Sequence, residues 1–286
     1  MEIIIGKTAG FCYGVKRAVE GTMKEIEKSQ EDVYCLGELV HNGEVIKNLE
    51  SRGLKIVENL ENADKKVIIR AHGIPKDIQD NARKLKIELI DFTCPKVLKI
   101  HEIANEYSQN GYYIFLTGTK THPENVGTIS YCGNNFFVIE SEDEVMKALE
   151  EFGKSKQKRL LLISQTTYSL EKFEKIEYLI KEKLSKDVDL IVKNTICMAT
   201  KLRQKETDEI SKKVDFMIII GGRNSSNTKK LFEIAKKNCD NTICIENEKE
   251  INLNKLVENS KIGIMAGAST PNESIKNVID VLKSMY

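Results

Sequence analysis

Three cysteines occupy similar positions in the chain, and each could bind a metal or act as a nucleophile. Cys12, Cys94 and Cys197 each follow an apolar run and a turn, and each precedes a helix-like segment. Backbone N–H groups and the dipole at a helix start favour the thiolate, the form of cysteine that binds metals. The three cysteines suggest a metal site, although none of them forms a Cys-x-x-Cys pair. Structural zinc normally takes four protein ligands and leaves no position open. An iron-sulfur cluster held by three thiolates would leave one iron available to a substrate.

Polar residues follow these cysteines at nearly equal distances. The first set lies 29, 28 and 28 residues downstream and consists of His41, His122 and Ser225. The second set lies 60, 72 and 72 residues downstream and consists of His72, Thr166 and Ser269. Three cysteines could recur only because the chain repeats, but the matched polar residues favour a metal site over that alternative.

The polar residues suit an anionic ligand such as phosphate, because hydroxyl, amide and imidazole groups all donate hydrogen bonds. The third repeat adds Gly221-Gly222, which opens into a helix start where anions bind. The complete candidate set is His41, His72, His122, Thr166, Ser225, Ser226, Asn227 and Ser269. A single histidine is usually structural, but three at equivalent strand ends indicate ligand contacts. The fourth, His101, lies within a predicted helix and is expected to be a surface or packing residue.

Glu124 is the only acid among the matched positions, and it is the candidate proton donor. If its carboxyl group faces phosphate oxygens away from water, both desolvation and like charge raise its pKa. The alternative is a glutamate that favours a helix start after Pro123.

These residues require three similar repeats of strands and helices to position them. Each repeat has a strand, a cysteine turn and a helix, then a strand that ends at glycine, a short strand with an acidic turn and a further apolar strand. A period of roughly 80 to 100 residues indicates triplicated domains, because solenoid repeats are shorter. Alternation of strands and helices predicts mostly parallel sheets, whose carboxyl ends bind ligands. The predicted fold is therefore α/β, with three small domains related by a pseudo-threefold axis around a central iron-sulfur cluster.

The domain boundaries follow from the repeats. The first repeat is predicted at residues 14–97, the second at 98–193 and the third at 194–286. No strand follows the last helix of the third repeat. Residues 1–13, which contain an apolar run at 3–5, are therefore predicted to complete it.

Composition narrows the function classes. The 286 residues include 44 Lys and Arg against 43 Asp and Glu, and no basic-aromatic stretch is present, so nucleic-acid binding is not favoured. No apolar run approaches the roughly 18 residues of a membrane span, and the N-terminus does not resemble a signal peptide, so a cytoplasmic protein is expected. Cytoplasmic cysteines are kept reduced. The other four are expected to be small core residues, and they are Cys35, Cys132, Cys239 and Cys244.

Nine short motifs spread over nearly the whole chain are highly specific in combination. They are Gly10-Phe11-Cys12-Tyr13-Gly14-Val15, Glu38-Leu39-Val40-His41-Asn42, Ala71-His72-Gly73, Thr93-Cys94-Pro95, His122-Pro123-Glu124, Gln165-Thr166-Thr167, Thr195-Ile196-Cys197, Asn224-Ser225-Ser226-Asn227 and Gly267-Ala268-Ser269-Thr270-Pro271. With these motifs the chain resembles the family of 4-hydroxy-3-methylbut-2-enyl diphosphate reductases, which act last in the non-mevalonate isoprenoid pathway. The departures from the family pattern involve no proposed ligand, and they are Arg70, Phe92, Leu202 and Gly222.

The resemblance implies a [4Fe-4S] cluster on Cys12, Cys94 and Cys197. The residues that it implies for diphosphate binding are His41, His72, Ser225, Ser226, Asn227 and Ser269, with His122 nearby. Thr166 would orient the hydroxyl end of the substrate, and Glu124 would deliver protons. Two electrons from ferredoxin or flavodoxin would expel the hydroxyl group as water and give isopentenyl and dimethylallyl diphosphates.

Two other functions are alternatives to a reductase. A zinc or mononuclear-iron hydrolase of a phosphorylated metabolite would need closely spaced ligands such as His-x-His or His-Glu-x-x-His, and the chain has neither. A non-catalytic iron-sulfur sensor that regulates genes or RNA should have a basic surface, and the balanced charge argues against one.

Overall fold

The computed structural model describes residues 2–29, 31–251 and 260–284, and the chain divides into two compact units. The first unit comprises Met1–Met23, Val40–Leu54 and Met198–Tyr286. The second unit comprises Lys24–Leu39 and Lys55–Cys197. Within the described residues the strands form three four-stranded sheets, one in the first unit and two that belong almost entirely to the second.

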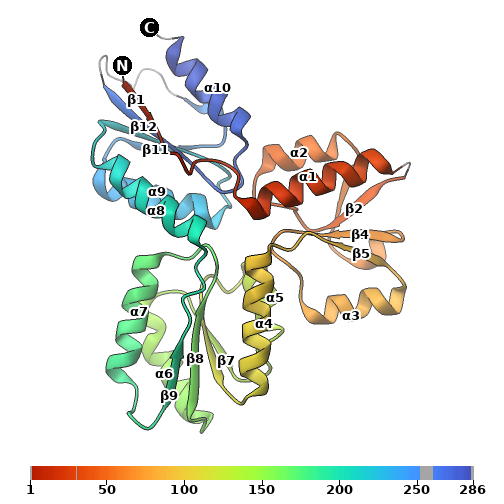
Figure 1. Cartoon of the computed structure of the whole chain (residues 1–286), viewed down its shortest axis with the longest axis vertical. Helices are drawn as coiled ribbons and strands as arrows, with labels where there is room; N and C mark the ends of the chain where they lie inside the picture. Colours follow the sequence, from red (N-terminus) through yellow and green to blue (C-terminus); the bar gives the residue numbers. More distant parts are fainter. Residues whose placement is uncertain (1, 30, 252–259, 285–286) are drawn as a thin grey trace. The chain divides into compact units, whose positions relative to one another are not determined.

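The sheet of the first unit has the strand order β1-β12-β10-β11, and every neighbouring pair is parallel. Its strands are β1 (Glu2–Ile5), β12 (Lys261–Ala266), β10 (Phe216–Ile220) and β11 (Thr242–Ile245). The helices of the first unit are α8 (Met198–Ser211), α9 (Ser226–Asn238), α10 (Asn272–Lys283), α2 (Gly43–Glu50) and the start of α1 (Tyr13–Lys28), with a short 3-10 turn η3 (Glu248–Glu250). Helix α10 covers one face of the sheet, and α8 and α9 cover the other (Figure 1). Apolar side chains of these helices pack against the strands.

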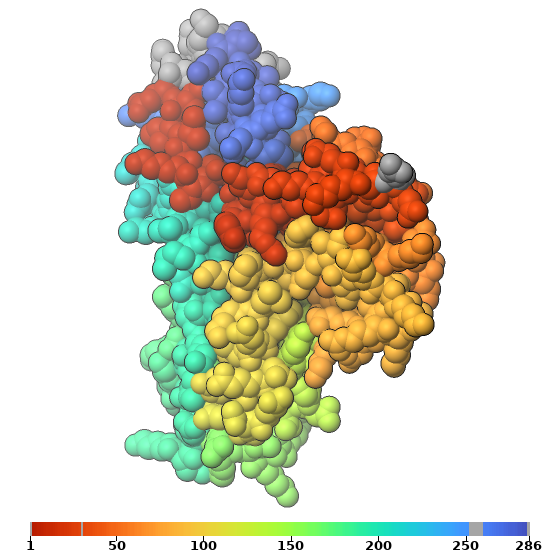
Figure 2. Space-filling view, turned by 45° about the vertical axis from the view of Figure 1, so that its right-hand side comes forward, coloured from red at the N-terminus to blue at the C-terminus, as the bar shows by residue number. Residues whose placement is uncertain are grey.

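The N-terminal strand lies at the edge of this sheet. Ile3 of β1 pairs with Ile262 of β12, and it packs in the same apolar cluster as Ile275 of α10. Figure 2 shows the N-terminal segment in red directly against α10 in blue. This is the pairing expected for an N-terminal strand that completes the last repeat.

The second unit holds the other two parallel sheets, with orders β3-β2-β4-β5 and β7-β6-β8-β9. The strands of the first are β3 (Leu54–Val57), β2 (Val33–Leu36), β4 (Lys66–Ile69) and β5 (Glu88–Asp91). Those of the second are β7 (Phe136–Ile139), β6 (Tyr113–Thr117), β8 (Arg159–Ser164) and β9 (Asp189–Val192). The helices are α3 (Lys76–Leu85), α4 (Pro95–Gln109), α5 (Pro123–Ile129), α6 (Val145–Lys154) and α7 (Leu170–Lys183), with 3-10 turns η1 (Leu60–Asn62) and η2 (Glu142–Glu144).

Glycine ends the second strand of each predicted repeat for a conformational reason. Gly37, Gly118 and Gly221 follow β2, β6 and β10, and their φ angles are 69°, 149° and 151°. Side chains disfavour these values, so glycine allows the chain to leave the strand and turn toward the next helix. That helix then begins with a capping side chain, which is Asn42 for α2, His122 for α5 and Ser225 for α9.

The three parallel sheets with their covering helices confirm the predicted α/β fold. The boundaries 14–97, 98–193 and 194–286 with 1–13 stay a prediction, as does a common centre for the three repeats. Among the described residues, no helix combines the length and the apolar character that a membrane span requires.

Candidate functional site

The three candidate cysteines all lie at helix starts, as predicted. Cys12 directly precedes α1, Cys94 is the N-cap of α4 and Cys197 directly precedes α8. All three are partly exposed, whereas Cys35, Cys132 and Cys239 are buried in the core as expected. Cys244, the remaining residue expected in the core, is only partly buried.

Each cysteine turn is tied to a turn that carries a second-set polar residue. The Cys12 N–H donates to the Ala268 carbonyl oxygen at 3.0 Å, and the Cys94 N–H donates to the Ala71 oxygen at 3.0 Å. The Cys197 N–H donates to the carbonyl oxygen of Thr166 itself at 3.1 Å. Ala268 and Ala71 directly precede Ser269 and His72, so one backbone contact recurs in all three repeats.

Glu124 and Thr166 form a buried polar pair. The Thr166 N–H donates to Glu124 Oε1 at 2.6 Å, and the Thr166 hydroxyl donates to Oε2 at 2.6 Å. The Glu124 side chain is 2% exposed. Burial raises its pKa to about 7, and the two bonds from Thr166 oppose this rise only in part. A carboxyl group with such a pKa can hold and release a proton near neutral pH.

Two histidines lie beside this pair. His122 is the N-cap of α5, and its Nδ1 accepts the Glu124 N–H at 3.2 Å, so any proton of the neutral ring is on Nε2. The rings of His72 and His122 meet edge to face, with centroids 5.4 Å apart. In the second unit a chain of contacts thus joins Cys94, His72, His122, Glu124, Thr166 and Cys197.

Asn125 and Gln165 hold the turns on both sides of the Glu124–Thr166 pair. Gln165 Oε1 accepts from Asn125 Nδ2 and from the Thr119 N–H, both at 3.1 Å. The two side chains are 0% and 1% exposed, and a Cβ atom on Gly118 would lie 2.4 Å from Asn125 Nδ2. The sequence analysis predicts no role for these two amides, although Gln165 lies within one of the family motifs. They could have been recognised as polar residues directly next to the candidates Glu124 and Thr166.

The first unit brings together the other candidates around the start of α9. Ser225 Oγ accepts the Thr228 N–H at 3.3 Å, and Ser226 begins the helix. Asn227 is 2% exposed, and neither its side-chain oxygen nor its nitrogen has a hydrogen-bond partner within the described residues. Buried polar atoms of this kind indicate a ligand, and the positive end of the helix dipole favours an anionic one.

His41 and Ser269 are joined in the same unit. The Ser269 hydroxyl donates to the His41 carbonyl oxygen at 3.0 Å. A Cβ atom on Gly222 would lie 2.6 Å from that oxygen, so glycine permits the close approach of the two turns. Gly222, one of the departures from the family pattern, therefore has a packing reason.

His101 packs in the core, which confirms the second of its two predicted roles, surface or packing residue. It is buried in α4, stacks on Tyr131 with ring centroids 4.7 Å apart and lies against Gly73. Burial lowers its pKa to about 4, against an opposing effect of Asp91, so the ring is neutral near pH 7.

The donor set fits an iron-sulfur cluster better than a hard cation. Thiolates are the ligands that such clusters use, and these three are partly exposed at helix starts. Glu124, the only acid among the candidate residues, already accepts hydrogen bonds from Thr166 through both carboxylate oxygens.

Comparison with known proteins agrees with this chemistry. A family model described as LytB protein matches residues 3–283. A 4-hydroxy-3-methylbut-2-enyl diphosphate reductase of Caldanaerobacter subterraneus is 42% identical over 100% of this chain and 98% of its own length. The protein of that name from Clostridioides difficile is 38% identical, with 100% of both chains covered.

Two solved structures are similar as well. A structure of (E)-4-hydroxy-3-methyl-but-2-enyl diphosphate reductase, described as the terminal enzyme of the non-mevalonate pathway, is 36% identical, with a TM-score of 0.71 over 99% of this chain and 100% of the other. The E-1-hydroxy-2-methyl-but-2-enyl-4-diphosphate reductase of Plasmodium falciparum is 29% identical, with a TM-score of 0.89 over 99% and 88% of the two chains. This chain therefore belongs to the LytB family of 4-hydroxy-3-methylbut-2-enyl diphosphate reductases, which confirms the family predicted from its motifs.

Proposed function

We propose that this protein is an iron-sulfur reductase that converts 4-hydroxy-3-methylbut-2-enyl diphosphate into isopentenyl and dimethylallyl diphosphates. The observation that carries the proposal is the buried Glu124–Thr166 pair, whose Thr166 carbonyl oxygen binds the N–H of Cys197. This arrangement couples a proton carrier with a pKa of about 7 to a candidate metal ligand.

Cys12, Cys94 and Cys197 would hold the cofactor, a [4Fe-4S] cluster. When bound, the cluster supplies two electrons one at a time and a Lewis-acidic iron for the departing hydroxyl group. The partial exposure of the three thiols suits this role, because a cluster that reduces a substrate must be reachable by that substrate.

Glu124 would supply protons in this reaction, and Thr166 would orient the hydroxyl end of the substrate. Two electrons and two protons enter for each turnover. The carbon–oxygen bond breaks, the hydroxyl group leaves with one proton as water, and the second proton joins a carbon atom of the allylic product. Burial of Glu124 keeps its proton in place until the leaving group accepts it. His122, which fixes the first turn of α5 through the Glu124 N–H, completes the catalytic group.

The diphosphate would bind to His41, His72, Ser225, Ser226, Asn227 and Ser269, with His122 nearby. The unpaired amide of Asn227 at the start of α9 supports this role most directly, because a phosphate oxygen would satisfy its nitrogen.

We also propose the setting in which the reaction takes place. Ferredoxin or flavodoxin would deliver the electrons, and the protein would work in the cytoplasm. The chain would be organised as three repeats, at residues 14–97, 98–193 and 194–286 with 1–13.

The first experiment is to determine iron and acid-labile sulfide in protein purified without oxygen. We expect about four of each per chain. The Cys12/Cys94/Cys197→Ser variant should lose both, whereas a matched Cys35/Cys132/Cys239→Ala variant should keep them. Zinc alone, or no metal after anaerobic reconstitution, would overturn the proposal and favour the hydrolase.

The second experiment is a reductase assay on the loaded protein with the hydroxylated diphosphate and a chemical one-electron donor. The Glu124→Gln variant should bind the substrate and keep its cluster, but it should lose most turnover, on the order of 10²-fold or more. Turnover that survives the change would remove Glu124 from its role.

A further inference from the structure

The loop that leads to Cys12 is held mainly by residues outside it. Residues 6–12 join β1 to α1, and within this described loop the backbone hydrogen bond runs from the Ala9 N–H to the Gly6 oxygen. At its ends, the Gly6 N–H donates to Ile264 and the Cys12 N–H donates to Ala268. The middle of the loop must therefore be fixed by side chains of other elements.

Glu206 of α8 holds the first half of the loop. One oxygen accepts the Lys7 N–H at 2.7 Å, and the other accepts the Thr8 N–H at 2.9 Å and the Thr8 hydroxyl at 2.5 Å. Burial alone would raise the pKa of Glu206, but these hydrogen bonds outweigh it and leave the pKa below its usual value. The carboxylate is therefore ionised near pH 7 and binds as a strong acceptor.

Arg203 of the same helix holds the second half of the loop. Its side chain is only 4% exposed, and Nη2 donates to the Gly10 carbonyl oxygen at 2.6 Å. On its other side Gly10 lies against α10, since a Cβ atom there would be 2.8 Å from Asn272 Oδ1, and its φ of 98° requires glycine. Burial of a charged guanidinium costs desolvation free energy. A buried arginine that donates to a backbone carbonyl two residues before Cys12 therefore indicates a specific role for the loop conformation.

We propose that Arg203 and Glu206 are positioning residues that hold the 6–12 loop in the conformation in which Cys12 binds the iron-sulfur cluster. The inference rests on the proposed function for the identity of the metal group. Holding the loop in advance lowers the conformational entropy that Cys12 would lose on ligation, so the metal is bound more tightly and released more slowly. Neither residue touches the cluster in this proposal, because both act through the backbone of the loop.

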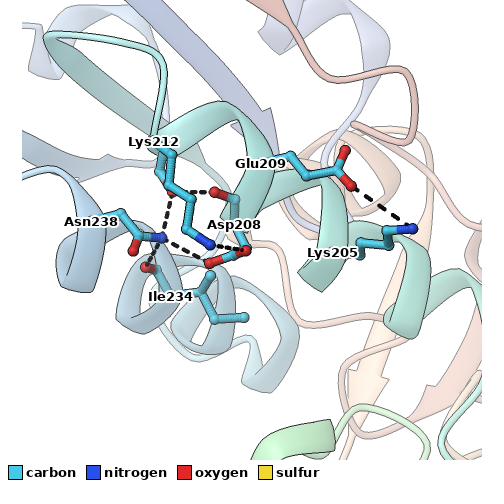
Figure 3. A network of polar contacts seen from close by, with 7 residues as sticks. Lys205, Asp208, Glu209, Lys212, Ile234 and Asn238 are labelled. Carbon is cyan, nitrogen blue, oxygen red and sulfur yellow. Dashed lines mark hydrogen bonds and ion pairs between the residues drawn. The ribbon is translucent and has the colours of Figure 1, made fainter.

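A purely structural role would give a different result, and α8 offers a matched control. Asn238, the last residue of α9, contacts the side of α8 that faces α9. Its Nδ2 donates to Asp208 Oδ1 at 2.9 Å and to Ser211 Oγ at 3.0 Å, in a network that includes the Lys212–Asp208 ion pair (Figure 3). The Asn238→Ala change therefore loosens α8 while the hydrogen bonds that join Arg203 and Glu206 to the loop remain.

The first measurement is hydrogen–deuterium exchange by mass spectrometry on the full chain without metal. In Arg203→Met, exchange of the peptide over residues 6–13 should rise at least about tenfold, the change expected when a hydrogen bond to a charged group is lost. Peptides that contain Cys94 should exchange as in the wild type, whereas the Cys197 peptide also loses the bond from Arg203 Nη1 to the Ala199 oxygen and is not used as a reference. Arg203→Lys should restore part of the protection, because the lysine ammonium can still donate to Gly10.

The second measurement is the rate of iron release from the loaded protein to a chelator. We expect faster release from Arg203→Met and Glu206→Gln than from Asn238→Ala, with thermal stabilities reported for all three. Unchanged exchange of residues 6–13, equal acceleration at all three cysteine turns, or release that follows thermal stability alone would overturn the inference. If the wild-type protein binds no iron but Arg203→Met still shows the expected rise in exchange of residues 6–13, the proposed function is refuted and the restraint of the loop is established.

Discussion

Replacement of Glu124 by glutamine should stabilise the folded protein at high pH and much less at low pH. Burial raises the pKa of this carboxyl group from 4.5 to about 7, so the fold prefers the protonated form. Glutamine imitates that form, because its oxygen can accept the Thr166 N–H while its amide donates to the Thr166 hydroxyl.

The sign and size of the effect follow from proton binding. Below pH 4.5 the carboxyl group is protonated in the folded and the unfolded protein, and its contribution to stability is complete. As the pH rises from 4.5 through 7, the unfolded chain releases the proton first, so stability is lost. The difference between the two pKa values corresponds to roughly 3 kcal/mol of unfolding free energy above pH 7. Glu124→Gln should not show this loss.

The assay compares thermal unfolding of wild type and variant between pH 4.5 and 8.5 at equal iron content. The advantage of Glu124→Gln should grow with pH and reach several degrees in Tm. Glu50→Gln, an exposed change in α2, should show no such trend. A constant difference across the pH range would refute the reasoning, since it would mean that Glu124 titrates alike in the folded and unfolded states.

Three further outcomes test the same environment. Thr166→Val removes a donor to the ionised carboxylate, so infrared spectra should show the protonated carboxyl of Glu124 persisting to higher pH, with roughly tenfold greater proton affinity. Burial lowers the pKa of His101 to about 4, so the wild type should lose about 3 kcal/mol of unfolding free energy as the pH falls from 6.5 to 4. In acid unfolding experiments, His101→Phe should largely abolish that loss. Gly118→Ala should destabilise the protein by about 1–3 kcal/mol in urea unfolding, because its Cβ would overlap two amides, whereas Gly153→Ala in open space should be neutral or stabilising.

The sequence predicted the repeated backbone well because that information is local. Apolar runs, glycines at strand ends and helix starts after each cysteine can all be recognised in a few neighbouring residues. The N-terminal strand could be assigned because one repeat lacked a strand and residues 3–5 had the right character, and β1 pairs with β12 accordingly.

The restraints around the site could not be predicted in the same way, because they depend on contacts between distant residues. Asn125 and Gln165 are forty positions apart, and only the fold brings the two amides to 3.1 Å. Arg203 and Gly10 are separated by 193 positions. Nothing local marks a polar side chain as buried and aimed at a particular carbonyl oxygen, so spacing alone could not separate these residues from ordinary helix positions.

The three cysteine turns share one backbone contact but place different residues beside it. The cysteine N–H groups donate to the carbonyl oxygens of Ala71, Thr166 and Ala268, so the second-set residue is the acceptor itself at Cys197 and directly follows the acceptor at Cys94 and Cys12. In the second unit Thr166 contacts the only acid of the candidate set, whereas in the first unit Ser269 donates to the backbone of His41. We expect a substitution at any of these second-set positions to leave the neighbouring cysteine turn in place, because the restraint on the cysteine is a backbone hydrogen bond that the side chain does not make.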